Sequence, residues 1–174
     1  EILEGAAQQI VKLLKRETVI YDVKDGKLEH PLRRVPQGEE DITIEDEACE
    51  EQAAAWALEN NRHAGTGTDH FKQAKRQYLA IRVNSTVYGV VGIMIQKQPL
   101  DAFENSVLLS ILGECALALE NDKNVREKEE AAILAKNEQL RANLLRTISH
   151  DLRTPLTSIS GNANNLLYNE SCLD

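Results

Sequence analysis

The feature that most constrains this 174-residue chain is a helical pattern that continues from Asp101 to Pro155. Within that range, only Gly113 offers a stop signal for a helix. A continuous helix over these residues would extend for about 80 Å, at about 1.5 Å per residue. A small domain cannot bury so long a helix, so it requires a partner, and the simplest partner is a second copy of the chain.

Two apolar stripes are expected along this helix. The first stripe is predicted to pack on a sheet, and its members are Val107, Leu108, Ile111, Leu112, Cys115 and Leu119. The second stripe has spacings of seven, four, four and four residues, and its members are Ile133, Leu140, Leu144, Ile148 and Leu152. The mixed-charge stretch 120–130 between them is either a solvated face or a signalling linker.

The first hundred residues predict alternating helices and strand pairs. Helices are expected at 1–16 and 45–60, the second with a capping box that begins at Thr43, and strands at 18–23, 27–34, 77–83 and 86–96. Asp25-Gly26 indicates a hairpin, residues 61–69 a glycine-containing break, and Gly89 and Gly92 a bulge or a close backbone approach. This order predicts an α+β fold, an antiparallel sheet with helices on one side.

Composition excludes several classes of protein. Apolar residues make up 42% of the chain but aromatic residues only 4%, so the core must be aliphatic. A net charge of −8 argues against nucleic-acid binding and against an anionic membrane surface. Cys49, Cys115 and Cys172 lack metal-ligand or redox spacing, which fits a reducing compartment. No signal peptide and no apolar run of membrane-spanning length are found, so no membrane span is expected, and both ends look like cuts in a longer protein.

The residues around His150 form the clearest chemical constellation. One apolar stripe is predicted here, with members Ile148, Leu152, Leu156 and Ile159. His150 should point about 200° away from Ile148, with Asp151 beside it and Thr154 one turn further on. Pro155 cannot donate a backbone hydrogen bond, so a kink is predicted there. A neutral imidazole nitrogen is a good nucleophile toward phosphorus, and Asp151 could fix its tautomer.

The run S-H-D-L-R-T-P-L at 149–156 resembles the H-box of sensor histidine kinases, and residues 144–167 resemble the Kdp-type potassium-responsive family. The resemblance implies that His150 is the phosphoacceptor, Asp151 a general base and Thr154 the residue that orients water for dephosphorylation of a response regulator. Arg153 either pairs with phosphate or regulator acids, or is simply solvated. ATP with Mg²⁺ would bind in a catalytic domain outside this chain.

Residues 1–118 resemble a GAF sensor domain, on the pattern W-x-x-E-N-N-R-H-A-G-T-G-T-D-H at 56–70 followed by Q-Y-L-A-I. The resemblance implies a sensor domain at 1–118, a helical linker at 119–140 and the first helix of a truncated dimerisation and phosphoacceptor domain at 141–174. It also implies a homodimer, a response-regulator receiver domain as partner, and the cytoplasmic portion of a membrane-anchored bacterial protein.

A second constellation lies in the loop at 64–69. Its glycines and threonines, among them Thr66 and Thr68, could present N–H and hydroxyl donors to an anionic ligand, so the possible ligand loop includes these residues and Asp69. Trp56 could line a pocket, although a plain loop and a core tryptophan are the simpler interpretations. His63 and His70 flank the loop, but no metal site is expected.

Three functions remain open. The chain is the sensor and phosphoacceptor fragment of a histidine kinase, inactive alone without an ATP-binding domain, or a non-enzymatic GAF module for ligand binding or dimerisation, or a purely structural coiled-coil adaptor.

Overall fold

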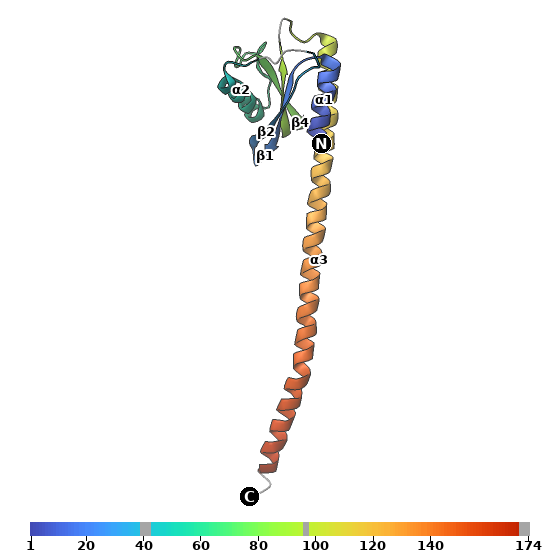
Figure 1. The fold of residues 1–174 in the computed structure, drawn as a ribbon. Helices are drawn as coiled ribbons and strands as arrows, with labels where there is room; N and C mark the ends of the chain where they lie inside the picture. Colours follow the sequence, from blue (N-terminus) through green and yellow to red (C-terminus); the bar gives the residue numbers. More distant parts are fainter. Residues whose placement is uncertain (39–42, 96–97, 171–174) are drawn as a thin grey trace. The chain divides into compact units, whose positions relative to one another are not determined.

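The computed structural model describes residues 1–38, 43–95 and 98–170, which form two compact units, Glu1–Asn124 and Val125–Asp174. The elements, in chain order, are α1 (Ile2–Leu14), β1 (Thr18–Lys24), β2 (Lys27–Arg34), α2 (Glu47–Asn60), β3 (Ala64–Gly65), β4 (Arg76–Val83), β5 (Thr86–Met94) and α3 (Ala102–Glu170), as Figure 1 shows. The predicted α+β class, with an antiparallel sheet, flanking helices and a long C-terminal helix, is confirmed.

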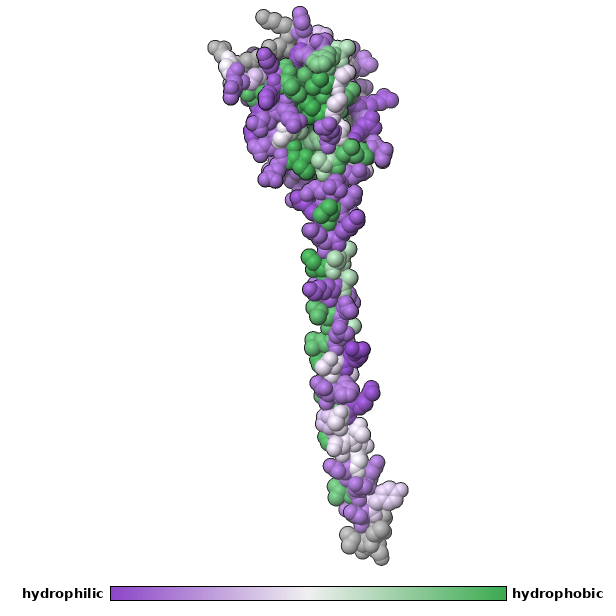
Figure 2. Space-filling view, turned by 90° about the vertical axis from the view of Figure 1, so that its right-hand side faces the viewer, coloured by the Kyte–Doolittle hydropathy of each residue, from purple (hydrophilic) through white to green (hydrophobic). Residues whose placement is uncertain are grey.

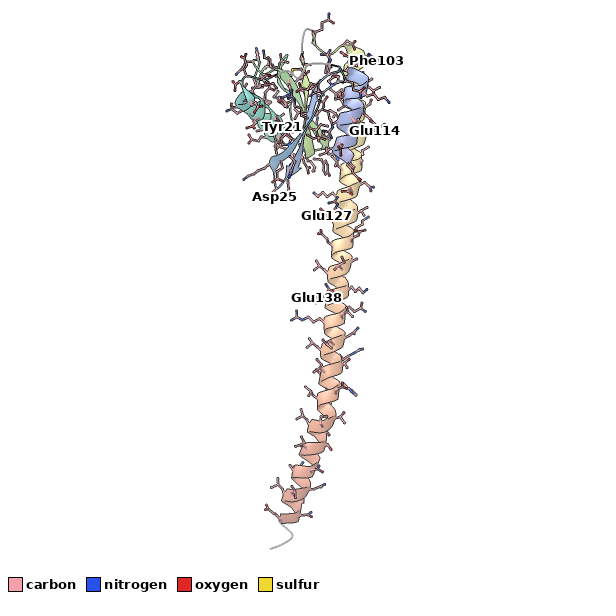
Figure 3. The ribbon with its side chains drawn as sticks, in the orientation of Figure 1. Tyr21, Asp25, Phe103, Glu114, Glu127 and Glu138 are labelled. Carbon is pink, nitrogen blue, oxygen red and sulfur yellow. The ribbon has the colours of Figure 1, made fainter. Side chains whose placement is uncertain are left out.

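The sheet has the strand order β2-β1-β5-β4-β3, and each neighbouring pair is antiparallel. The predicted hairpin joins β1 to β2, and Asp25 lies at its tip (Figure 3). Asp25 and Gly26 have φ values of 51° and 74°. A two-residue turn with positive φ at both positions matches the twist of the flanking strands, which explains why Asp-Gly predicted it correctly.

Helices cover both faces of the sheet, so the prediction of helices on one side is wrong. α1 and the first part of α3 pack on one face, around Ile20, while α2 packs on the other, around Val19 and Tyr21 (Figure 1). Successive side chains of a strand point to opposite faces. Since β1 is apolar at consecutive positions, each face needs its own cover.

α2 begins at Glu47, and its cap is not Thr43 but Asp46. The Asp46 carboxylate accepts a hydrogen bond from the Cys49 N–H at 3.0 Å. Asp46, expected as the acidic partner of the capping box, is itself a strong N-cap residue. The small side chains of Ala53, Ala54 and Ala57 are fully buried, so α2 can approach the sheet closely.

The predicted break at 61–69 contains a strand. β3 pairs Ala64 with Tyr78 and Gly65 with Gln77. Gly65 has a φ of 94°, and an added Cβ would overlap the carbonyl oxygen of Arg76, so only glycine fits. A two-residue strand carries no periodicity, which is why the sequence did not reveal it.

Both glycines of β5 allow the close approach that was predicted. A Cβ on Gly89 would lie 2.8 Å from the carbonyl oxygen of Tyr21, and one on Gly92 would lie 2.8 Å from Val19 Cγ1. The β4–β5 register also shifts between Ile81 and Arg82, which marks a bulge. β5 ends at Met94, before the predicted end at residue 96, which lies outside the described residues.

α3 runs without interruption through Gly113 and Pro155. The proline does not end the helix, and the ribbon curves in this C-terminal part (Figure 1). The first predicted stripe is confirmed as core at Leu108, Ile111, Leu112 and Cys115. By length and composition alone, α3 is long and apolar enough to cross a membrane. It owes this to an 18-residue apolar stretch, 28% of which is buried within the structure.

Candidate functional site

The segment of α3 around His150 holds the sequence-predicted catalytic set. The side chains of His150 and Asp151 are 79% and 72% exposed, and His150 Nδ1 lies 3.6 Å from Asp151 Oδ1. That separation is within ion-pair range but too long for a hydrogen bond. Thr154, one turn beyond, is also exposed. The helix therefore presents an accessible imidazole with a carboxylate beside one of its two nitrogens.

Among the residues that the structure describes, none covers the apolar stripe of this segment. Ile148, Leu152, Leu156 and Ile159 are all exposed. Figure 2 shows apolar side chains, in green, recurring along the helix among polar ones, and Figure 3 shows side chains such as Glu138 projecting from it. Exposed apolar side chains at helical spacing mark an interaction surface.

The loop residues proposed as ligand donors are engaged within the loop. Thr68 Oγ1 lies 2.8 Å from the Gly65 oxygen and 2.9 Å from the His70 oxygen, and the Thr66 N–H donates to the Arg76 oxygen at 3.1 Å. Asp69 is exposed. These contacts favour the simpler interpretation, a loop held in shape by its own hydrogen bonds.

Trp56 is partly buried against the core cluster under α2, and its ring stacks on His70 with centroids 4.0 Å apart. Thr66 lines a surface pocket that does not include Trp56; the other residues that line it include His63, Gln77, Asp101 and Asn105. The structure therefore brings Trp56 to the end of the loop but does not gather the predicted donors around one ligand position.

Sequence reasoning missed a charged cavity between α2 and the sheet. The cavity has a volume of about 380 Å³, and its lining includes Tyr21, Arg33, Glu50 and Arg76. Arg33 donates two hydrogen bonds of 2.9 Å to Glu17, and Arg76 donates from Nε at 3.2 Å and also from Nη2. Only 1% of Glu17 and 5% of Arg76 are exposed.

The guanidinium groups of Arg33 and Arg76 favour the ionised form of Glu17. Burial raises the pKa of Glu17, but the hydrogen bonds and charges of Arg33 and Arg76 outweigh burial, so the pKa is lowered overall. Glu50 accepts hydrogen bonds from the Lys75 N–H at 2.5 Å and from the Tyr78 hydroxyl at 2.6 Å. Burial and the nearby Glu50 carboxylate raise the pKa of Tyr78, which therefore stays protonated.

Metal ligands do not gather in the part of the chain that the structure describes. No group of three or more His, Cys, Asp or Glu side chains there could hold a metal ion.

Comparisons with known proteins bear on both units. Residues 140–173 match the family model described as His Kinase A (phospho-acceptor) domain. The chain is 32% identical over its whole length to the Sensor protein KdpD of Clostridium acetobutylicum, and 33% identical over 85% of its length to the Sensor protein KdpD of Escherichia coli. It spans only 19% and 16% of the length of these curated relatives.

A solved structure supports the fold of the first unit. The GAF domain of the potassium sensor histidine kinase KdpD from Escherichia coli aligns with a TM-score of 0.56 at 23% identity, over 73% of this chain and 85% of that one. The first unit therefore has a GAF-type fold, and residues 140–173 match a phosphoacceptor domain of histidine kinases. Along its length the chain is similar to the KdpD sensor proteins, in agreement with the resemblance to Kdp-type sensor kinases that the sequence indicated.

Proposed function

We propose that this chain relays a signal from its GAF domain to His150, and that His150 accepts a phosphoryl group and passes it to an aspartate of a response regulator. The observation that carries the proposal is the exposed His150 within a segment that matches a phosphoacceptor family. The exposure of the His150 side chain also supports the role, because its imidazole must be reached by both a kinase domain and a regulator.

His150 would attack through Nε2. The Asp151 carboxylate lies beside Nδ1, so a proton held on Nδ1 leaves the lone pair of Nε2 free. An N–P bond would form as the bond between the γ-phosphorus of ATP and its bridging oxygen breaks, with ADP as the leaving group. The imidazole would then carry a positive charge, and Asp151 could accept the Nδ1 proton as a general base after a small rotation closes the 3.6 Å gap.

Thr154 would act in the opposite reaction, the dephosphorylation of the regulator. Its hydroxyl lies on the exposed surface one turn after His150, where it could orient a water molecule toward a phosphorylated regulator. Replacing Thr154 with alanine should leave phosphorylation of His150 intact and slow dephosphorylation of the regulator.

The remaining parts of the pathway lie outside this chain. We infer that ATP with Mg²⁺ binds to a separate catalytic domain, that the protein works as a homodimer, and that it is the cytoplasmic portion of a membrane-anchored bacterial kinase. We infer that the stimulus is potassium, since the solved relative is a potassium sensor histidine kinase, and that the controlled process is the expression of potassium-uptake genes, as the sequence resemblance implies.

The test supplies the missing catalytic domain in trans with labelled ATP. Label should reach His150 and should be absent from the His150→Gln variant, whereas the control His63→Gln should be labelled normally because His63 lies in the sensor unit. The chain alone should acquire no label. Label in the His150→Gln variant, or label without added catalytic domain, would contradict the proposal.

The cavity under α2 favours a second candidate function, a non-enzymatic ligand-binding module. Two of its charged lining residues, Glu50 and Arg76, are almost completely buried, so they could bind a polar small molecule. A ligand retained through purification and identified by mass spectrometry, with no labelling of His150, would favour this alternative.

A further inference from the structure

The connection between α1 and β1 joins the cavity under α2 to the first turn of α3. Arg16 and Glu17 are neighbours in this connection, and their side chains bind to different parts of the sensor unit. Arg16 Nη2 lies 3.2 Å from Glu104 Oε2, and Arg16 Nη1 donates to the Gln98 oxygen at 3.1 Å. Arg16 therefore holds the start of α3.

Glu104 is also the residue that caps α3. Its Oε2 accepts a hydrogen bond from the Asp101 N–H at 3.0 Å, while its own N–H donates to Asp101 Oδ1 at 2.7 Å. This reciprocal pair is a capping box, which satisfies two backbone donors at the helix start. The carboxylate that Arg16 binds is thus part of the structure that fixes the first turn of α3.

Glu17 reaches the cavity instead. Its carboxylate receives the guanidinium groups of Arg33 and Arg76, and both of these arginines line the cavity. Since Glu17 is almost completely buried, it cannot exchange a lost partner for water. Any change that draws Arg33 away from Glu17 therefore removes one of the two guanidinium groups that hold the Glu17 carboxylate.

Hydrogen bonds hold the backbone on both sides of the Arg16–Glu17 dipeptide. Lys15 caps α1 in the left-handed region, with its N–H bonded to the Val11 oxygen at 3.0 Å. The Glu17 oxygen accepts from the Met94 N–H at 2.9 Å, and the Thr18 hydroxyl donates to the Arg16 oxygen at 3.2 Å. With both sides fixed, a displacement of Glu17 is passed to Arg16 rather than absorbed by a loop.

We propose that Arg16–Glu17 couples the state of the charged cavity under α2 to the capped first turn of α3. The inference rests on the proposed function, because α3 is the helix that carries His150. It assigns a route to the relay: Arg33 and Arg76 at the cavity, then Glu17, then Arg16, then Glu104.

The test is a double-mutant cycle read by hydrogen exchange in the full chain. Arg33→Met removes one partner of Glu17, Arg16→Met cuts the link to Glu104, and the third variant combines both changes. The readout is exchange at the Glu104 and Asn105 amides, which bond to Asp101 in the capped turn. Arg33→Met should speed their exchange about tenfold, and it should add nothing in the Arg16→Met background.

The matched control is Arg34→Met. Arg34 is the next residue of β2, but it pairs with Glu4 of α1 at 2.6 Å. This variant should leave Glu104 and Asn105 exchange within about twofold of the parent. The core amide of Val91 serves as internal reference, since general unfolding would speed its exchange equally. Arg33→Lys keeps the positive charge, so its Glu104 and Asn105 amides should exchange at the parent rate.

Unchanged exchange at Glu104 and Asn105 in Arg33→Met, or full additivity of the two substitutions, would overturn the coupling. That failure is distinct from failure of the proposed function. Labelling of His150 by an added catalytic domain does not depend on the exchange result, and the exchange result requires no phosphorylation.

Discussion

The proposed phosphoacceptor role of His150 depends on its neighbour Asp151. Its carboxylate lies 3.6 Å from Nδ1, so it can fix the tautomer and accept the Nδ1 proton. Asp151→Asn should slow labelling of His150 by an added catalytic domain about 100-fold, because a general base typically contributes at least that much. Initial rates of labelling measure the effect, and Asp151→Glu should recover part of it. Equal rates for Asp151→Asn and the parent would exclude the base role.

Glu17 makes a second prediction, on stability. Glu17→Gln removes the Glu17 carboxylate that two guanidinium groups share and should lower the free energy of unfolding at pH 7 by about 3–5 kcal/mol. The control Glu4→Gln removes an exposed carboxylate paired with Arg34 and should cost about 0–1 kcal/mol. Urea denaturation of both variants provides the comparison.

The pH dependence of this effect has a definite sign. The pKa of Glu17 is lowered in the folded state from its ordinary value of 4.5. Its stabilisation is therefore complete above pH 4.5 and is lost as the pH falls through the lower folded-state value. The difference between parent and Glu17→Gln should shrink on acidification below pH 4.5, and a difference that stays constant would show that the pair contributes no such linkage.

Local signals explain which elements the sequence predicted well. Asp25-Gly26 determines its own hairpin through positive φ angles, and His150 is recognisable because its neighbours share one helix surface. Ala64–Gly65 was missed because its strand depends on pairing with β4. The cluster of Glu17, Arg33 and Arg76 was missed because Arg76 is 59 residues away from Glu17 in the chain. Local sequence patterns do not predict contacts between residues so far apart.

The glycines of β5 and α3 give a prediction at the scale of elements. Gly92→Ala places a Cβ 2.5 Å from Tyr78 Cε1, and the Tyr78 ring is held by its hydrogen bond to Glu50. The substitution should destabilise the sensor unit by about 1–3 kcal/mol through overpacking. Gly113→Ala has open space in the interior of α3 and should stabilise it by about 1 kcal/mol. Thermal unfolding of the two variants should shift in opposite directions, and a shift in the same direction would refute the packing argument.

At the scale of the whole molecule, charge and apolar surface oppose each other in self-association. The chain carries 28 acidic and 20 basic side chains, so two copies repel. The exposed apolar stripe, which includes Leu140 and Leu144, provides the attraction, since two such stripes can cover each other. Added salt should therefore strengthen association, because it screens the repulsion and leaves apolar burial intact.

Leu140→Asn combined with Leu144→Asn tests this balance by sedimentation velocity. Burying a leucine contributes roughly 1.5–3 kcal/mol, so the double variant should raise the dimer Kd at least about 100-fold. The control, Gln139→Asn combined with Ala142→Asn, changes the opposite side of the helix at about 100° per residue, and should leave the Kd within about threefold. Neither pair alters the net charge, so electrostatic repulsion is the same in both. If the two double variants sediment alike, the stripe is not the surface through which two copies associate.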